Sequence, residues 1–275
     1  MRALRAVDSG ARVVLVPTMG ALHEGHISLL AEARRMGTHV VASIFVNPLQ
    51  FAQLGDLARY PRDDLARYPR DEAGDLEKLR AAGCDLAWLP DVATMYPAGD
   101  ATTVDVGGPA LGWEGAARPG HFRGVATVVC KLFGQCKPEA ACFGEKDWQQ
   151  LQVIRRVQAD LSLGVQVVGV KTMRETDGLA MSSRNRFLSP ADRQTAPILH
   201  RGLQETLRAL RQGEAVATAL AGACAALQAA GLAVDYLALV DGPTLLPIES
   251  LQTGARLIAA ARLGSVRLLD NIGLA

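Results

Sequence analysis

The chain has 275 residues, and its 29 Lys and Arg against 28 Asp and Glu leave a formal charge of +1. This balance argues against binding nucleic acid through bulk positive charge, although a local basic patch remains compatible with it. Hydrophobic residues make up 49% of the chain, which is enough for one or two packed domains. The sequence has no run of about 18 uncharged apolar residues, no secretory leader and no C-x-x-C pair among its five cysteines. We therefore expect a cytoplasmic protein with inert thiols and no membrane segment.

Residues 1–172 alternate short apolar runs with amphipathic stretches. The runs are continuous, as in strands buried on both faces of a parallel sheet. The predicted strands are 12–16, 40–46, 85–89, 140–143 and 165–170, and the predicted helices are 27–36, 75–82, 124–133 and 147–159. This alternation predicts a Rossmann-like, doubly wound α/β sheet.

From residue 173 the pattern changes to helices followed by alternating strands. Ser189 is a candidate N-cap and Pro190 suits the first position of a helix that we predict over 190–212. A second, Ala-rich helix is predicted over 215–230. The strands of a half-exposed antiparallel sheet are predicted at 234–240, 256–261 and 266–269. Residues 173–275 are therefore expected to form a smaller C-terminal α+β domain.

An internal repeat stands out in the first half of the chain. The segment DLARYPRD at 56–63 recurs without a gap at 64–71. Eight residues advance a helix by about 800°, roughly 80° out of register, and Pro61 and Pro69 break helices. We expect the repeat to lie in a surface loop. We favour a neutral tandem duplication over the alternative, a lengthened lid on a functional site.

The strongest chemical motif is PTMGALHEGH at 17–26, between a predicted strand and a predicted helix. Gly20 and Gly25 allow the backbone to approach a ligand closely, and a helix start offers N–H groups and a positive dipole. His23 and His26 are three residues apart and share one helix face, so both imidazoles can donate to oxygens that gain negative charge. The alternatives are ordinary structural histidines or two metal ligands, although no third ligand follows by spacing.

Three further segments carry polar groups at places where ligands bind. In 143–150, Lys146 is a candidate for phosphate and Asp147 for ribose hydroxyls. The segment MSSRN at 181–185 offers two hydroxyls and a guanidinium to phosphate, and the amides of 47–51 suit a small polar substrate. Each segment has a purely structural alternative, namely a capped helix start, a Ser-rich turn or a simple turn. The sequence contains neither a P-loop, nor a dinucleotide fingerprint, nor a hydrolase elbow.

The chain resembles the pantothenate synthetase (pantoate–β-alanine ligase) family of the HxGH nucleotidyltransferases. The resemblance runs from about residue 12 to 271 and is carried by VPTMGALHEGH, SIFVNPLQF, DLARYPR, RPGHFRGVATVV, ACFGEKDWQQL, DGLAMSSRN and RLLDN. It implies that ATP and (R)-pantoate form pantoyl adenylate and pyrophosphate, and that β-alanine then gives pantothenate and AMP. It also implies Mg²⁺ and a homodimer, with small-molecule substrates, no nucleic acid and no membrane as partners.

The resemblance also implies roles for individual residues. His26 corresponds to the proton donor, and His23, Lys146 and Arg184 complete the catalytic set. The implied ATP-binding residues are Met19, Gly20, Ala21, Leu22, His23, Glu24, Gly25, His26, Gly144, Glu145, Lys146, Asp147, Met173, Met181, Ser182, Ser183 and Arg184. Gln50 and Gln150 correspond to the pantoate-binding residues, Gln50 also to the β-alanine contact, and Asn47 is a further substrate candidate. The Mg²⁺ ligands stay open, since ATP phosphates and water supply most of its shell.

The resemblance assigns residues 1–172 to nucleotide and pantoate binding, and residues 173–275 to a domain that carries the Ser-Ser-Arg loop. The chain departs from the family pattern in its second copy of DLARYPR, and in Leu49 and Lys171 where Met and Pro are usual. Two other functions remain open. One is a nucleotidyltransferase that stops after nucleotide transfer, and the other is a non-catalytic nucleotide-binding protein disabled by the longer loop.

Overall fold

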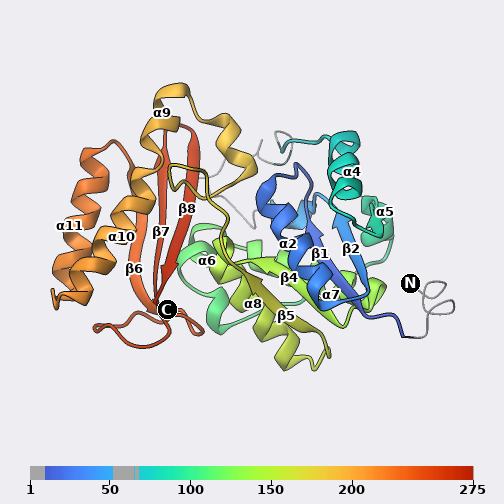
Figure 1. The fold of residues 1–275 in the computed structure, drawn as a ribbon. Helices are drawn as coiled ribbons and strands as arrows, with labels where there is room; N and C mark the ends of the chain where they lie inside the picture. The colour runs from blue at the N-terminus through green and yellow to red at the C-terminus, as the bar shows by residue number, and fades with distance from the viewer. Residues whose placement is uncertain (1–9, 52–64, 66–67, 275) are drawn as a thin grey trace. The chain divides into compact units, whose positions relative to one another are not determined.

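The structure is a computed structural model that describes residues 10–51, 65 and 68–274. The chain divides into two compact units (Figure 1). Unit 1 comprises Met1–Glu145 and Gln149–Lys171, and unit 2 comprises Lys146–Trp148 and Thr172–Ala275. The short segment Lys146–Trp148 therefore packs with the C-terminal part of the chain, although it follows a strand of unit 1.

A five-stranded parallel sheet forms the centre of unit 1 (Figure 1). Its strands are β1 (Val13–Thr18), β2 (His39–Ile44), β3 (Leu86–Trp88), β4 (Ala140–Gly144) and β5 (Gln166–Val170). They lie in the order β3-β2-β1-β4-β5, and every ladder is parallel. The direction of winding reverses between β1 and β4, and ligands of such sheets bind beyond the carboxyl ends of the strands at this point. The predicted parallel α/β sheet is confirmed.

Helices of unit 1 cover the sheet and bury its apolar strands. They are α2 (Glu24–Met36), α4 (Glu72–Ala81), α5 (Val92–Met95), α6 (Trp113–Ala117), α7 (His121–Cys136) and α8 (Trp148–Asp160), with 3₁₀ turns η1 (Pro48–Gln50) and η2 (Gly108–Ala110). A third 3₁₀ turn, η3 (Glu145–Asp147), is divided between the two units. Leu29, Leu30 and Ala33 of α2 pack on Val14 and Val16 of β1. The sequence did not predict α5, α6 or the 3₁₀ turns, because they are too short to show a hydrophobic period.

Unit 2 contains an antiparallel sheet with helices packed on it. The strands β6 (Ala233–Asp241), β7 (Ala255–Leu263) and β8 (Val266–Gly273) lie in the order β6-β7-β8. The helices are α9 (Pro190–Thr195), α10 (Ile198–Arg211) and α11 (Val216–Ala229), and η4 (Ser183–Phe187) precedes them. Helices α10 and α11 lie side by side against the sheet (Figure 1), with Leu203 of α10 and Leu257 of β7 in one core. The predicted C-terminal α+β architecture is confirmed.

The single helix predicted over 190–212 is wrong, because the structure has two helices there. Ser189 does cap α9, since its side chain accepts a hydrogen bond from Asp192 N, and Pro190 follows at the first helical position. The chain leaves α9 after Thr195, and α10 begins after Pro197. Proline has no N–H for the helical ladder and its ring collides with the preceding turn, so Pro197 separates the helices.

The first copy of the repeat and the beginning of the second lie outside the described residues. The surface loop predicted for them therefore stays a prediction. The described end of the second copy leads directly into α4, where Asp71 is the N-cap and accepts from Gly74 N at 3.1 Å. Tyr68 is only 8% exposed and its ring meets Phe51 edge-on, with the centroids 5.9 Å apart. The second copy thus contributes to the packing of unit 1.

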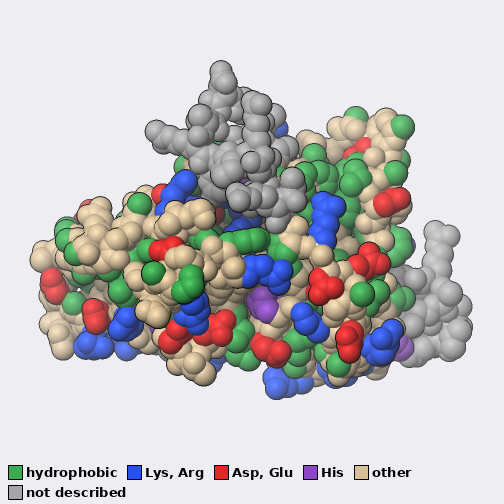
Figure 2. Space-filling model, turned by 90° about the horizontal axis from the view of Figure 1, so that it is seen from above, with side chains coloured by type: hydrophobic (Ala, Val, Ile, Leu, Met, Phe, Trp, Pro, Cys, Tyr) green, Lys and Arg blue, Asp and Glu red, His purple; other side chains and the backbone are tan. Residues whose placement is uncertain are grey.

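The described surface carries charges of both signs. Figure 2 shows Lys and Arg side chains interspersed with Asp and Glu, as the near-zero formal charge predicts. Among the described residues, no helix combines the length and apolarity that a membrane span requires.

We predict that Leu203→Ala lowers the free energy of unfolding by about 2–5 kcal/mol, because it leaves a cavity in the core of unit 2. Leu203 is 0% exposed, whereas Leu246 is 65% exposed and provides a matched control. Leu246→Ala should change stability by at most about 0.5 kcal/mol. Urea unfolding monitored by circular dichroism measures both, and equal effects would contradict the assigned core.

Candidate functional site

The segment after β1 forms a tight turn that only small residues fit. Gly20 has φ +80° and Ala21 has φ +52°, both in the left-handed region. A Cβ on Gly20 would lie 2.8 Å from Asp75 Oδ2 and 3.2 Å from Ile44 Cγ2. The hydroxyl of Thr18 donates to Ser43 O at 2.7 Å and accepts from Gly20 N at 3.2 Å. The turn is therefore bound to the neighbouring strand β2 as well as to α4.

Asp75 of α4 fixes the turn through two consecutive backbone amides. Its side chain accepts from Ala21 N and from Leu22 N, each at 2.7 Å, and the residue is 1% exposed. Lys78 Nζ, three residues further along α4, donates to Leu22 O at 2.7 Å. The sequence analysis missed both residues. The available signal was an acidic residue four positions before the buried Leu79, on what is otherwise the apolar face of this helix.

His23 and His26 begin α2 and cap each other. Gly25 N donates to His23 Nδ1 at 3.1 Å, and His23 N donates to His26 Nδ1 at 3.3 Å, which makes a capping box. The ring centroids are 4.2 Å apart. Because Nδ1 is the acceptor in both rings, each neutral imidazole carries its hydrogen on Nε2. The start of α2 thus provides two adjacent Nε2–H donors at the positive end of a helix dipole.

The structure corrects one expectation about this motif. The backbone amides of Gly20, Ala21, Leu22 and Gly25 already donate within unit 1. These four amides are therefore engaged within the protein. Glu24 is exposed.

Asn47 lies behind Gln50 and is almost fully buried, at 1% exposed. Its Nδ2 donates to Gln50 Oε1 and to Gly124 O, each at 3.1 Å. Its Oδ1 accepts from Leu49 N at 3.3 Å and from the Tyr96 hydroxyl at 2.8 Å. The Asn47 side chain thus uses all of its hydrogen-bonding groups to hold η1 and to orient the carboxamide of Gln50.

Helix α7 and Arg118, which directly follows α6, support η1. His121 Nδ1 lies 3.2 Å from Gln50 O, and Arg118 Nη2 donates to the same carbonyl at 3.4 Å. A Cβ on Gly124 would lie 2.4 Å from Leu49 O, so this close approach requires glycine.

Burial, with a smaller contribution from Asp100, raises the pKa of Tyr96 well above its usual value, and its hydroxyl therefore stays a donor.

The two glutamines that begin α8 differ in their surroundings. Gln149 is 6% exposed, accepts from Glu114 N at 2.9 Å and donates to Pro109 O at 3.0 Å. It therefore anchors the segment of η2 and α6. Gln150, the predicted substrate residue, is half-buried in unit 1.

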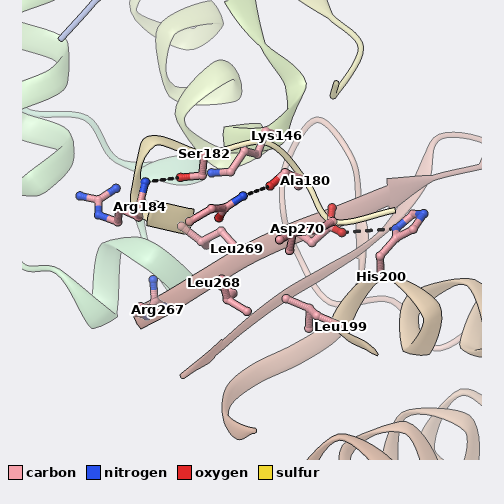
Figure 3. Close-up of a pocket in the computed structure, with 12 residues that line it drawn as sticks. Lys146, Ala180, Ser182, Arg184, Leu199, His200, Arg267, Leu268, Leu269 and Asp270 are labelled. Atoms are coloured by element: carbon pink, nitrogen blue, oxygen red, sulfur yellow. Dashed lines mark hydrogen bonds and ion pairs between the residues drawn. The ribbon is translucent and has the colours of Figure 1, made fainter. Parts of the chain in front are cut away.

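Unit 2 brings the second set of predicted residues together in one pocket. Lys146, Ser182 and Arg184 line it (Figure 3), and it is partly open to solvent. Ser182 is the N-cap of η4, and its hydroxyl accepts from Arg184 N at 3.3 Å. Lys146 Nζ lies 3.4 Å from Oδ1 of the exposed Asp147. Segments distant in sequence thus line one pocket, and its lining also includes Asp270 and His200 (Figure 3).

The remaining predicted ATP residues of unit 2 lie on a short hairpin. Met181 N donates to Met173 O at 3.0 Å, and Arg174 and Ala180 form an isolated β-bridge. Met173 is 43% exposed, and Ser183 is half-buried at the start of η4. Gly144 and Glu145 are half-buried and belong to unit 1.

Two buried cysteines have unreactive thiols. Burial raises the pKa of Cys136 to about 11 and that of Cys142 to about 12, so these thiols stay protonated near pH 7, as the sequence predicted.

Within residues 10–51, 65 and 68–274, no group of three or more His, Cys, Asp or Glu side chains is arranged to hold a metal ion.

A family model described as pantoate-beta-alanine ligase matches residues 1–273. A pantothenate synthetase of Acidiphilium cryptum is 59% identical, and the alignment covers 100% of this chain and 97% of the relative. The solved pantothenate synthetase of Thermus thermophilus is 51% identical with a TM-score of 0.90, over 98% of this chain and 96% of that one.

The chain belongs to the pantoate–β-alanine ligase family. The resemblance drawn from the motifs is thereby confirmed, and so is the enzyme class. The reaction predicted from the sequence, an AMP-forming ligation of pantoate and β-alanine, is the reaction of this family. A pantoate–β-alanine ligase of Francisella tularensis, 29% identical with a TM-score of 0.79, covers 99% of this chain and 95% of that one. It was solved in complex with "Beta-gamma ATP" and β-alanine.

We predict that Asp75→Asn lowers the free energy of unfolding by about 1–3 kcal/mol. The side chain of Asn has one oxygen, whereas the amides of Ala21 and Leu22 need two acceptors. Asp160→Asn is the matched control, since Asp160 pairs with Arg156 on the exposed surface of α8. The control should change stability by at most about 1 kcal/mol. Denaturant titration measures both, and an equal loss would contradict the role given to Asp75.

Proposed function

We propose that this chain joins (R)-pantoate to β-alanine in two steps that consume ATP. Pantoate attacks the α-phosphorus of ATP, which gives pantoyl adenylate and releases pyrophosphate. The amine of β-alanine then attacks the acyl carbon, which gives pantothenate and AMP. The observation that carries this proposal is the 59% identity to a pantothenate synthetase over the whole chain, with every chemical motif intact. The ATP and β-alanine complex of the Francisella relative supports the same substrates.

The histidines at the start of α2 would act on the phosphates of ATP. In-line displacement at phosphorus requires positioning and charge stabilisation rather than a protein nucleophile, which agrees with the raised thiol pKa values. His23 and His26 each carry a donor on Nε2, and we assign His26 the role of proton donor. The other residues of this ATP segment are Met19, Gly20, Ala21, Leu22, Glu24 and Gly25.

The pocket of unit 2 would bind the polyphosphate. Lys146 and Arg184 supply positive charge, and Ser182 and Ser183 supply hydroxyls, which together suit charge-assisted hydrogen bonds to phosphate oxygens. The exposed carboxylate of Asp147 suits the ribose hydroxyls. Gly144, Glu145, Met173 and Met181 would complete the ATP site by correspondence with the family.

The substrate amides lie on η1 and α8. We assign Gln50 and Gln150 to pantoate, and Gln50 also to β-alanine. The contacts of Asn47 support a role in orienting Gln50 rather than in binding substrate itself. Pantoyl adenylate hydrolyses when it meets water, so the site must exclude solvent during the second step.

Further assignments concern the metal, assembly and organisation. We propose that Mg²⁺ is bound through phosphate oxygens of ATP and through water, which is typical of this ion. We assign it no protein ligand and no step in the reaction. We also propose a cytoplasmic homodimer with a Rossmann-like first domain. Residues 1–172 would bind nucleotide and pantoate, and residues 173–275 would contribute the Ser-Ser-Arg loop.

A coupled assay with each substrate omitted in turn tests this function. AMP, pyrophosphate and pantothenate should form only when ATP, pantoate and β-alanine are all present. Formation of ADP and phosphate would overturn the proposal. A stable nucleotidylated product that is indifferent to β-alanine would identify a different nucleotidyltransferase. ATP binding without pyrophosphate release would identify a non-catalytic protein.

We predict that His26→Ala lowers kcat about 10²- to 10³-fold, the range for the loss of one transition-state donor. His26→Asn should be similarly slow, although its carboxamide oxygen can replace the acceptor for His23 N–H and so preserve the cap. His39→Ala is the control, because His39 lies on β2 beside Thr38, outside the assigned site. Steady-state kinetics that give full activity for His26→Ala would refute the role of this imidazole.

A further inference from the structure

The end of β8 carries two neighbouring polar residues that are both buried. Asp270 is 4% exposed and Asn271 is 5% exposed. Because side chains alternate along a strand, Asp270 shares the face of Leu268 and Val266, which belong to the core shared with α10. Asn271 lies on the opposite face. The pair can therefore reach two different parts of unit 2 at once.

Asp270 binds the hairpin that leads into the Ser-Ser-Arg loop. Its carboxylate accepts from Arg174 Nη1 at 2.7 Å and from Arg174 Nη2 at 2.9 Å, and His200 Nδ1 lies 3.3 Å away (Figure 3 shows the contact with His200). Burial raises the pKa of Asp270, but the contacts with His200 and Arg174 lower it by a larger amount, so the net pKa lies below its usual value. The carboxylate is therefore ionised at neutral pH.

Arg174 transmits this contact to the backbone of the hairpin. Its Nη1 also donates to Gly178 O at 3.0 Å, and its Nη2 to Asn271 O at 3.4 Å. The β-bridge between Arg174 and Ala180 closes the hairpin directly before Ser182. These contacts thus connect the hairpin that precedes the Ser-Ser-Arg loop to β8.

Asn271 binds the backbone of the other phosphate-binding segment. Its Nδ2 donates to Lys146 O at 2.8 Å, and its Oδ1 accepts from Arg256 Nη1. The guanidinium of Arg256 lies 3.4 Å from the ring centroid of Trp148, whose Nε1 donates to Gly242 O at 2.7 Å. The segment Lys146–Trp148 is therefore attached to the sheet of unit 2 at both of its ends.

We propose that Asp270 and Asn271 are positioning residues that set the spacing between Lys146 and the Ser-Ser-Arg loop for the triphosphate of ATP. This inference rests on the proposed function. In this proposal Asn271 acts through the backbone of Lys146, and Asp270, although it lines the pocket, acts through the Arg174 guanidinium. A displacement of about 1 Å in such a site can cost about 10²-fold in rate. A buried ion pair such as Asp270–Arg174 adds little net stability by itself, which agrees with a role in positioning.

Titration calorimetry with ATP on the full chain tests the proposal without requiring turnover. Asn271→Asp keeps an acceptor for Arg256 but replaces the donor to Lys146 O with an oxygen. We expect it to weaken ATP binding about tenfold, because the Lys146 segment loses the contact that positions it for the phosphates. Gln135→Glu is the matched amide-to-acid control, because Gln135 accepts from Trp88 on the surface of α7. It should leave ATP binding unchanged, and unchanged binding by Asn271→Asp would overturn the proposal.

The two half-reactions separate positioning from general destabilisation. Pantoyl adenylate lacks the β- and γ-phosphates, so Asn271→Asp and Asp270→Asn should slow pyrophosphate release from ATP and pantoate about tenfold or more. The same variants should use supplied pantoyl adenylate and β-alanine at nearly the wild-type rate. Equal losses in both half-reactions would overturn the positioning role. If Asp270→Asn does not fold, Arg174→Lys provides a milder change to the same contact. A wild-type chain that binds ATP but forms no pantoyl adenylate would instead refute the proposed function.

Discussion

The buried carboxylate of Asp75 is the interaction on which the histidine segment depends. Two consecutive amides, of Ala21 and Leu22, point at it, which is possible only because Gly20 and Ala21 adopt left-handed backbone. This turn directs the chain from β1 into α2 and thereby determines where the imidazoles begin the helix. An apolar residue at position 75 would leave two buried N–H groups without an acceptor, which is costly inside a protein.

Unit 2 uses the same physical device in a different setting. Asp270 is also a buried carboxylate that binds a segment carrying functional side chains, through an arginine instead of amides. Asn271 adds a neutral donor to a backbone carbonyl. His23, Lys146 and Arg184 lie at a helix start or in short 3₁₀ turns, whereas Asp75 and Asp270 lie within α4 and β8. This arrangement is typical of sites that need precise positions on segments that are irregular by nature.

The architecture of the fold was largely predictable from the sequence. The apolar runs at β1, β2, β4 and β5 are continuous because both faces of a parallel sheet are covered, and that pattern survives without any tertiary information. The prediction failed at Pro197, where the apolar period of α10 extends from α9 across a residue that interrupts the helical ladder. It also missed α5 and α6, since a helix of four or five residues is too short to display a period.

The sequence by itself determined the family and its reaction, because the motifs retain the residue types of the family in their order. Only the tertiary structure showed that Asp75, Asp270 and Asn271 bind the segments that carry the candidate site residues, and that the Asn47 side chain forms its hydrogen bonds with Gln50 and its surroundings. The reason is physical. The local sequence pattern indicates which side chains lie on one face of a strand or helix. A buried carboxylate, in contrast, can accept hydrogen bonds from amides more than fifty residues away in the chain. Such partners are defined by packing and not by spacing along the chain.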